Sequence, residues 1–258
     1  MTGKMPQRVF ADTGKSVSAL GLGAVKFGRN TGVKYPGGGY ELPTDAEIES
    51  LLDLALAGGI NLLDTAPAYG TSEERLGKLL GRRREKFFIV TKTGEEFDGE
   101  SSKHIFTAEH TRLSVERSLK RLRTDRLDCV LVHSSHKDMD VLTGTPVLET
   151  LSRLKGEGKI ASFGASTYTV VGGMKAVDLS DCVMVAFNAE YRAEEEVIDY
   201  AAKKGRAVLI KKGLSSGQAK DAKTGVRFAA LRPGVTSLVF GSLNPANISA
   251  NINALIEG

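Results

Sequence analysis

The chain has 258 residues, of which 41% are hydrophobic and 26% charged, with a formal net charge of +4. This composition excludes a disordered chain and predicts a globular protein that buries a sizeable core. The excess Lys and Arg are dispersed apart from the run Arg82-Arg83-Arg84, and no groove-reading motif accompanies them, so we expect no nucleic-acid partner. A mildly basic rim suits an anionic cofactor.

The N-terminal segment and the two cysteines point to a reducing compartment. Residues 1–8 contain no apolar stretch, and no run approaches the roughly 18 apolar residues that a membrane span requires. Cys129 and Cys182 lie in apolar runs without the spacing of a metal or redox motif, so we expect buried free thiols. We therefore predict a cytoplasmic protein with no membrane partner.

The first predicted elements surround a long glycine-rich segment. A turn at residues 12–15 suggests a hairpin, and a first strand follows at residues 19–24. Residues 25–44 contain five glycines and two prolines, which predicts an irregular loop of functional length that could cover a pocket. A helix should begin at Thr44, because the apolar residues from Ile48 to Leu56 keep to one helical face.

Strand and helix signals then alternate to the end of the chain. Strands are predicted at residues 60–63, 87–91, 127–132, 160–164, 183–187, 207–210 and 237–240, and helices from near residues 72, 107, 146, 170, 194, 225 and 245. Right-handed crossovers would close these units into a barrel. We predict one α/β domain over residues 1–258, a (β/α)8 TIM barrel with a short N-terminal hairpin at its bottom.

Four residues, Asp64, Tyr69, Lys92 and His133, lie where apolar runs give way to polar side chains. Three of them end successive predicted strands, and Tyr69 follows in the turn after Asp64. Because neighbouring parallel strands lie roughly 4.8 Å apart, the carboxylate, the ammonium and the imidazole would meet at one rim of the barrel. Barrel enzymes keep their active sites at that rim.

This set of residues could handle a proton. A tyrosine with its ordinary pKa near 10 is a poor acid, and lowering that pKa by about three units takes about 4 kcal/mol of differential interaction. We expect Lys92 to supply much of this, with Asp64 holding Lys92 charged and His133 orienting a substrate carbonyl. Protonating an oxygen while a hydride reaches carbon also needs a hydride source, which implies a nicotinamide cofactor.

Each of these residues also has a structural explanation. Asp64 could order the turn that follows it, and Tyr69 could be a packed loop aromatic. Lys92 could be a solvated charge at a strand end, and His133 could be a histidine with satisfied hydrogen bonds at a strand end. His133 and His136 could suggest a metal pair, but no third ligand follows them, so we expect no metal site. The coincidence of all four residues on neighbouring strands favours catalysis.

Nearly the whole chain resembles the aldo-keto reductase family. The similar segments are Asp64-Thr-Ala-Pro-Ala-Tyr69-Gly70, Val90-Thr-Lys92 and Leu131-Val-His133-Ser134. The resemblance implies that Tyr69 is the general acid, that Asp64 and Lys92 tune it, and that His133 positions the carbonyl. It also implies hydride transfer from NADPH, with NADH possible, to a small-molecule carbonyl substrate, an aldehyde or a ketone.

The resemblance also implies where the cofactor binds. Ser166 and Thr167 are similar to a Ser-Asn pair, so Ser166 would contact the nicotinamide carboxamide. The segment 241–245 is similar to the part that holds the adenosine end, where Ser242 and the opening of the next helix could accept a phosphate. The full predicted cofactor set is Gly23, Ala24, Val25, Asp64, Ser166, Thr167, Met184, Lys211, Lys212, Gly213, Leu214, Gly241, Ser242, Leu243, Asn247 and Asn251.

The chain departs from the family pattern at several of these positions. Met184 stands where many members have Gln, and Lys211 and Lys212 stand where an aromatic residue often stacks on the nicotinamide. The two lysines could bind pyrophosphate or could simply be solvated. Residues 241–247 contain no basic side chain, which leaves both NADPH and NADH open. The segment 213–224 is shorter than in many relatives and predicts an open cofactor groove with fast exchange.

Two other functions fit parts of this pattern. A nicotinamide-binding barrel could sense redox state for a protein partner with little turnover, and the departures at Met184 and at the lysine pair would suit it. A phosphate-binding lyase or isomerase would need no nicotinamide, but the spacing of the four residues argues against it. Substrate choice would depend on the loops at residues 25–44, 134–145 and 213–224.

Overall fold

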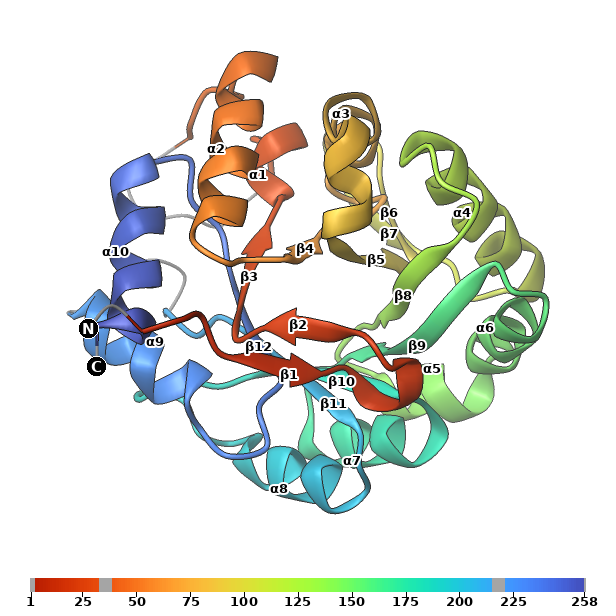
Figure 1. Ribbon diagram of the computed structural model, residues 1–258. Helices are drawn as coiled ribbons and strands as arrows, with labels where there is room; N and C mark the ends of the chain where they lie inside the picture. Colours follow the sequence, from red (N-terminus) through yellow and green to blue (C-terminus); the bar gives the residue numbers. More distant parts are fainter. Residues whose placement is uncertain (1–2, 33–38, 215–220, 258) are drawn as a thin grey trace.

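The computed structural model describes residues 3–32, 39–214 and 221–257. Its parallel strands follow one another around a closed barrel in chain order, with helices on the outside (Figure 1). This arrangement confirms the predicted (β/α)8 barrel. The barrel strands are β3 (Leu20–Gly23), β4 (Leu62–Asp64), β5 (Phe88–Thr93), β8 (Leu127–His133), β9 (Ile160–Ser166), β10 (Cys182–Ala186), β11 (Ala207–Lys211) and β12 (Ser237–Phe240).

A helix of at least eight residues follows each barrel strand. The first of these begins with a capping box, in which the Thr44 side chain accepts from the Glu47 amide and the Glu47 carboxylate accepts from the Thr44 amide at 2.7 Å. The predicted starts agree closely, except that α9 begins three residues before Gly225. The helices are α2 (Asp45–Ala57), α3 (Ser72–Leu79), α4 (Ala108–Arg121), α6 (Val147–Gly156), α7 (Val170–Leu179), α8 (Glu195–Lys203), α9 (Ala222–Ala230) and α10 (Pro245–Ile256).

Several short elements were missed by the sequence patterns. The segment 25–44 was predicted to be irregular, and this was wrong at its start, where Val25–Gly28 form the short helix α1. A single helical turn is too short to show hydrophobic periodicity. The predicted loop 134–145 likewise contains a helix. The remaining short elements are α5 (Asp138–Gly144), the strands β6 (Glu95–Phe97) and β7 (Ser102–His104), and the 3-10 helices η1 (Ala11–Thr13) and η2 (Gly81–Lys86).

The N-terminal hairpin closes the amino-terminal end of the barrel. Its strands β1 (Gln7–Val9) and β2 (Ser16–Ser18) pair antiparallel, and Figure 1 shows them lying across the barrel opening. Phe10 and Val17 are fully buried and pack among the inward-facing side chains. The ring centroid of Phe10 lies 4.5 Å from that of Phe88 at the start of β5. The predicted hairpin at the barrel bottom is therefore confirmed.

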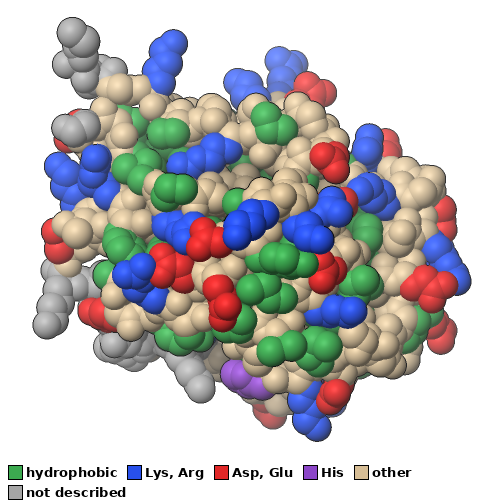
Figure 2. Space-filling view, turned by 90° about the horizontal axis from the view of Figure 1, so that it is seen from below, with side chains coloured by type: hydrophobic (Ala, Val, Ile, Leu, Met, Phe, Trp, Pro, Cys, Tyr) green, Lys and Arg blue, Asp and Glu red, His purple; other side chains and the backbone are tan. Residues whose placement is uncertain are grey.

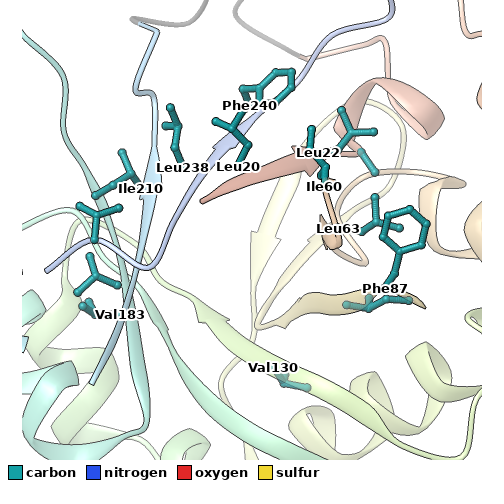
Figure 3. Close-up of a cluster of buried hydrophobic side chains, with 14 of the residues drawn as sticks. Leu20, Leu22, Ile60, Leu63, Phe87, Val130, Val183, Ile210, Leu238 and Phe240 are labelled. Carbon is teal, nitrogen blue, oxygen red and sulfur yellow. The ribbon is translucent and has the colours of Figure 1, made fainter. Parts of the chain in front are cut away.

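A second apolar layer fills the space between the barrel and its helices. Side chains of successive strand residues point alternately inward and outward, so that Leu62 belongs to the inner cluster and Leu63 to the outer one. Both faces of the strands are thus apolar, as parallel sheets require. Polar groups can meet a ligand only at the strand ends. Figure 3 shows part of the outer layer, including Leu20, Leu22, Ile60, Leu63, Phe87, Val130, Val183, Ile210, Leu238 and Phe240.

The cysteines and the surface agree with the composition. Cys129 and Cys182 are buried free thiols, as predicted, with their Sγ atoms 3.4 Å apart inside the barrel. On the face shown in Figure 2, basic and acidic side chains are interspersed. Within the described residues, no helix has the length and apolar character needed to cross a membrane.

Candidate active site

Asp64 and Lys92 form a buried ion pair at the carboxyl ends of β4 and β5. The register pairs Asp64 with Val90, so Lys92 lies two residues further along β5 and on the same face as Val90. Its Nζ donates to Oδ1 of Asp64 at 2.6 Å and to the carbonyl of Thr65 at 2.9 Å. The Lys92 side chain is only 1% exposed, so the alternative of a solvated strand-end lysine is wrong.

Tyr69 lies in a turn that is held by a close approach of two backbone segments. The carbonyl of Gly28, at the end of α1, accepts from the amide of Thr71 at 3.2 Å, and a Cβ on Gly28 would lie 2.6 Å from the Tyr69 carbonyl oxygen. Gly70 has a φ of +60°, and a Cβ there would lie 2.1 Å from the carbonyl oxygen of Gly28. Only glycine at both positions lets α1 pack against the turn and fix Tyr69.

The four residues predicted to act together meet at the carboxyl-terminal rim of the barrel. Nζ of Lys92 lies 4.7 Å from the ring centroid of Tyr69. The rings of Tyr69 and His133 are nearly perpendicular, with centroids 6.2 Å apart. His133 is the last residue of β8, which lies beside β5 in the barrel. A phenol, an ammonium, a carboxylate and an imidazole therefore face one small volume.

The pKa of Tyr69 differs from the expectation. Burial raises the pKa of Tyr69 to about 12, and Lys92 opposes this only in part. The expected lowering of the tyrosine pKa is therefore wrong for the ligand-free site, because the loss of solvation outweighs the nearby cation. Tyr69 retains some exposure to the cavity. Burial by itself lowers the pKa of Lys92, but Asp64 and Tyr69 reverse this and raise it above its ordinary value.

Glu95 is a functional-site residue that the sequence patterns missed. It begins β6, directly after Gly94, and its Oε2 lies 2.6 Å from Nδ1 of His133. Oε2 of Glu95 does not lie along the direction of the Nδ1–H bond. The two groups are therefore close enough for an ion pair, but their angle is not that of a hydrogen bond. No apolar run precedes Glu95, which is why the strand-end pattern did not select it. The signal that could have found it is a Gly-Glu pair closely following the strand lysine.

The Glu95 and His133 side chains influence each other's pKa. Burial raises the pKa of the Glu95 carboxyl, but contact with His133 outweighs it and holds the pKa at about 2. Burial lowers the pKa of His133 below its ordinary value, with Glu95 acting in the opposite direction. At neutral pH the carboxylate is therefore ionised.

A cavity of about 350 Å³ opens over these residues. Its walls include side chains that were not predicted, namely Lys26, Tyr168, Val239 and Phe240. Most of the predicted cofactor residues also line it. These are Gly23, Val25, Asp64, Ser166, Met184, Lys211, Lys212, Gly213, Leu214 and Gly241, together with the predicted catalytic residues Tyr69, Lys92 and His133.

The other predicted cofactor residues lie outside the cavity wall formed by the described parts of the chain. Ala24 and Thr167 are buried behind it, where their amides donate to the carbonyls of Asp64 and Met184. The hydroxyl of Ser242 accepts from the Asn244 amide at 3.1 Å in the turn before α10. The rest of this group is Leu243 in the same turn and Asn247 and Asn251 on α10.

Lys211 is held in place by groups of the cavity wall. Its Nζ donates to Oγ of Ser166 at 3.0 Å and to the carbonyl of Thr167 at 2.6 Å, and it lies 4.2 Å from the ring centroid of Tyr168. The alternative of a merely solvated lysine is wrong for this residue. Burial lowers the pKa of Lys211 to about 8, although Glu194 opposes the effect. Lys212 is exposed beside it.

The cavity residues fit a nicotinamide dinucleotide. The Ser166 hydroxyl accepts from Lys211 and keeps its own proton for a carboxamide oxygen. The two ammonium groups of Lys211 and Lys212 offer charge to a pyrophosphate, and a Cβ on Gly241 would meet only the carbonyl oxygen of Gly23 at 3.4 Å, which leaves room for a ligand. The predicted open groove after β11 depends on residues 215–220, which lie outside the described residues.

Comparisons with known proteins identify the family of the chain. The model of the aldo/keto reductase family matches residues 19–226. A crystal structure of a putative aldo-keto reductase from Pseudomonas aeruginosa is similar with a TM-score of 0.90 and 48% identity, covering 99% of this chain and 96% of that chain.

Curated relatives are similar over shorter parts. Aldo-keto reductase YhdN of Bacillus subtilis is 33% identical over 200 residues, which cover 74% of this chain and 56% of that protein. D-arabinose 1-dehydrogenase of Saccharomyces cerevisiae is 35% identical over 140 residues, which cover 50% of this chain and 38% of that protein. The matched segments thus span less than two thirds of either relative. Because the family model covers most of the chain, the chain belongs to the aldo/keto reductase family.

Proposed function

We propose that the protein is an oxidoreductase that reduces a small-molecule aldehyde or ketone to an alcohol with a nicotinamide cofactor. The observation that carries this proposal is the buried Lys92–Asp64 pair directly beside Tyr69, with Nζ of Lys92 4.7 Å from the tyrosine ring centroid. The dehydrogenase and reductase names of the relatives support the same class of reaction. A cavity of about 350 Å³ suits the nicotinamide end and a small carbonyl compound.

The four side chains at the rim have different roles in the proposed proton transfer. When bound, the nicotinamide supplies the hydride. Because the pKa of Tyr69 is raised to about 12, its hydroxyl stays protonated at neutral pH and is available to the carbonyl oxygen as negative charge develops there. Lys92 then stabilises the tyrosinate that remains, and Asp64 keeps Lys92 charged. His133 holds the substrate oxygen beside Tyr69.

The cofactor preference is proposed to include NADH as well as NADPH. We expect Ser166 to hold the carboxamide, and Lys211 and Lys212 to hold the pyrophosphate. The segment 241–257 contains no Lys or Arg that could pair with a ribose phosphate. The hydroxyl of Ser242 and the amides at the start of α10 would have to serve that phosphate in NADPH.

We propose that the protein works in the cytoplasm without a nucleic-acid or membrane partner. Cys129 and Cys182 lie in apolar strands without the spacing of a metal or redox motif, as is typical of proteins of a reducing compartment.

The test is a fluorescence titration with NADPH and NADH, followed by addition of 4-nitrobenzaldehyde while the nicotinamide absorbance is recorded. Binding with consumption of the reduced cofactor supports the reductase. Binding without consumption across several aldehydes and ketones would favour a redox-sensing barrel with little turnover. Absence of binding would overturn both.

A further inference from the structure

The carboxylate of Glu95 contacts the Nδ1 edge of the His133 ring. Oε2 of Glu95 lies 2.6 Å from Nδ1 of His133, and each side chain is 14% exposed. The antiparallel pairing of β6 with β7 places Glu95 opposite His104, two residues beyond the end of β5. Within the described residues, Nδ1 of His133 has no other polar partner.

A second contact fixes Glu95 from behind. Nη1 of Arg29 lies 3.9 Å from Oε1 of Glu95 and donates to the carbonyl of Ala68, the residue before Tyr69, at 3.0 Å. The guanidinium also stacks on Phe97, 3.5 Å from the ring centroid. The carboxylate therefore has little freedom to leave His133, and the same arginine ties it to the turn that carries Tyr69.

An ionised carboxylate can only accept a proton or a hydrogen bond. With Oε2 of Glu95 at 2.6 Å, an unprotonated Nδ1 would place two negatively polarised atoms in contact. A protonated Nδ1 instead places a positive partial charge beside the carboxylate, even though the N–H does not point directly at the oxygen, so Nδ1 carries the proton. We propose that Glu95 is a positioning residue that fixes the protonation of His133, with the proton on Nδ1 and, in the neutral ring, an unprotonated Nε2 left for the substrate.

This assignment has a chemical consequence that rests on the proposed function. A neutral His133 with an unprotonated Nε2 accepts a hydrogen bond from an alcohol hydroxyl but gives none to a carbonyl oxygen. In a ring that keeps its proton on Nδ1, only the imidazolium form also donates from Nε2. Glu95 therefore makes the binding of the carbonyl compound depend on a second proton on His133, whereas the alcohol binds the neutral ring.

Several charged or titratable groups face this pair and set how readily the second proton is taken up. Glu95 favours the imidazolium, whereas Lys92 and Lys211 disfavour it. Burial also disfavours it. The other titratable or charged groups near the pair are Tyr69, Asp64, Arg29, His104 and Tyr168.

The next residue of the same strand provides a matched control. Glu96 points to the opposite face of β6, where its Oε1 lies 3.1 Å from Nε2 of His110 and pairs also with Arg117. It is a second carboxylate–histidine contact, on the same hairpin, with the other ring nitrogen. Its partner His110 does not line the cavity, whereas His133, the partner of Glu95, does.

The experiment is long-range ¹H–¹⁵N NMR of the histidine rings across a pH series, in the wild-type protein and in the Glu95→Gln and Glu96→Gln variants. In the wild type, the neutral ring of His133 should show a protonated Nδ1 and an unprotonated Nε2. Glu95→Gln should lower the pKa of His133 and raise the population with the proton on Nε2, because an amide can also donate to Nδ1. Glu96→Gln should change His110 and leave His133 unchanged.

Two results would overturn the proposal. One is a wild-type His133 whose neutral ring carries its proton on Nε2, and this measurement needs no variant to fold. The other is an unchanged tautomer and pKa of His133 in Glu95→Gln. Neither spectrum requires turnover, so a protein that reduces no carbonyl compound would refute the proposed function and leave this assignment intact. In an active enzyme, Glu95→Gln should also flatten the pH dependence of reduction near the His133 pKa.

Discussion

Nζ of Lys92 lies 2.6 Å from Oδ1 of Asp64, in an ion pair whose side chains are 1% and 6% exposed. A lysine so deeply buried is stable only because its partner is fixed, and both charges come from neighbouring strands whose register is set by the barrel. The pair therefore serves two purposes, since it completes the rim of the barrel and holds a permanent cation beside Tyr69.

A single and a double variant of this pair should distinguish its structural purpose from its catalytic one. Lys92→Met leaves Asp64 buried without its cation, and we expect a loss of about 3–5 kcal/mol in the free energy of unfolding together with a loss of reductase activity. The double variant Asp64→Asn/Lys92→Met should recover much of the stability but none of the activity. Urea unfolding and steady-state kinetics on both variants test this. Recovery of activity in the double variant would show that the cation is not needed.

Substitution of Tyr69 by Phe should remove the proton donor and keep the fold. The expected result is unchanged cofactor affinity with a fall in kcat of about 100-fold or more, within the range of general-acid contributions. The control is Tyr200→Phe, whose hydroxyl donates to Asp178 at 2.7 Å on the outside of the barrel. Near-normal turnover in Tyr69→Phe would assign the proton to another group.

The fold and the buried Lys92–Asp64 pair could be predicted because both follow from short apolar runs along the sequence. Asp64, Lys92 and His133 each follow an apolar strand, and parallel strands bring their carboxyl ends together. Glu95 could not be predicted in this way, because it lies beyond the end of β5, at the start of the short hairpin β6–β7, and no hydrophobic periodicity marks that segment. The raised pKa of Tyr69 was missed for a related reason: residue spacing shows which charges are near, but not how completely water is excluded.

Lys211 should make cofactor binding depend on pH. Its pKa is lowered to about 8, so in the ligand-free protein the side chain is charged below that pH and neutral above it. Affinity for a dinucleotide should therefore fall as the pH rises through about 8. Lys211→Met should bind more weakly at pH 7 and lose this dependence. The control is Lys204→Met, because the Lys204 side chain is exposed and lies at the opposite end of the barrel. Titrations that give parallel pH curves for all three proteins would contradict the prediction.

The contact of β9 with β10 should tolerate no side chain at Gly164. A Cβ there would lie 2.0 Å from the carbonyl oxygen of its register partner Cys182. We expect Gly164→Ala to cost about 1–3 kcal/mol or more of unfolding free energy. Gly156→Ala, at the end of α6 with open space around it, should instead stabilise by about 0.4–1 kcal/mol. Denaturant midpoints of the two variants should move in opposite directions, and equal shifts would refute the argument from packing.

The most direct measurement follows the hydride itself. The protein would be incubated with 4-nitrobenzaldehyde and NADPH or NADH in which both hydrogens at C4 of the nicotinamide are deuterium, and the alcohol product would be analysed by mass spectrometry. We expect one deuterium in the alcohol with the wild-type protein and almost no product with Tyr69→Phe. Alcohol without deuterium, or equal product from both proteins, would contradict hydride transfer assisted by Tyr69.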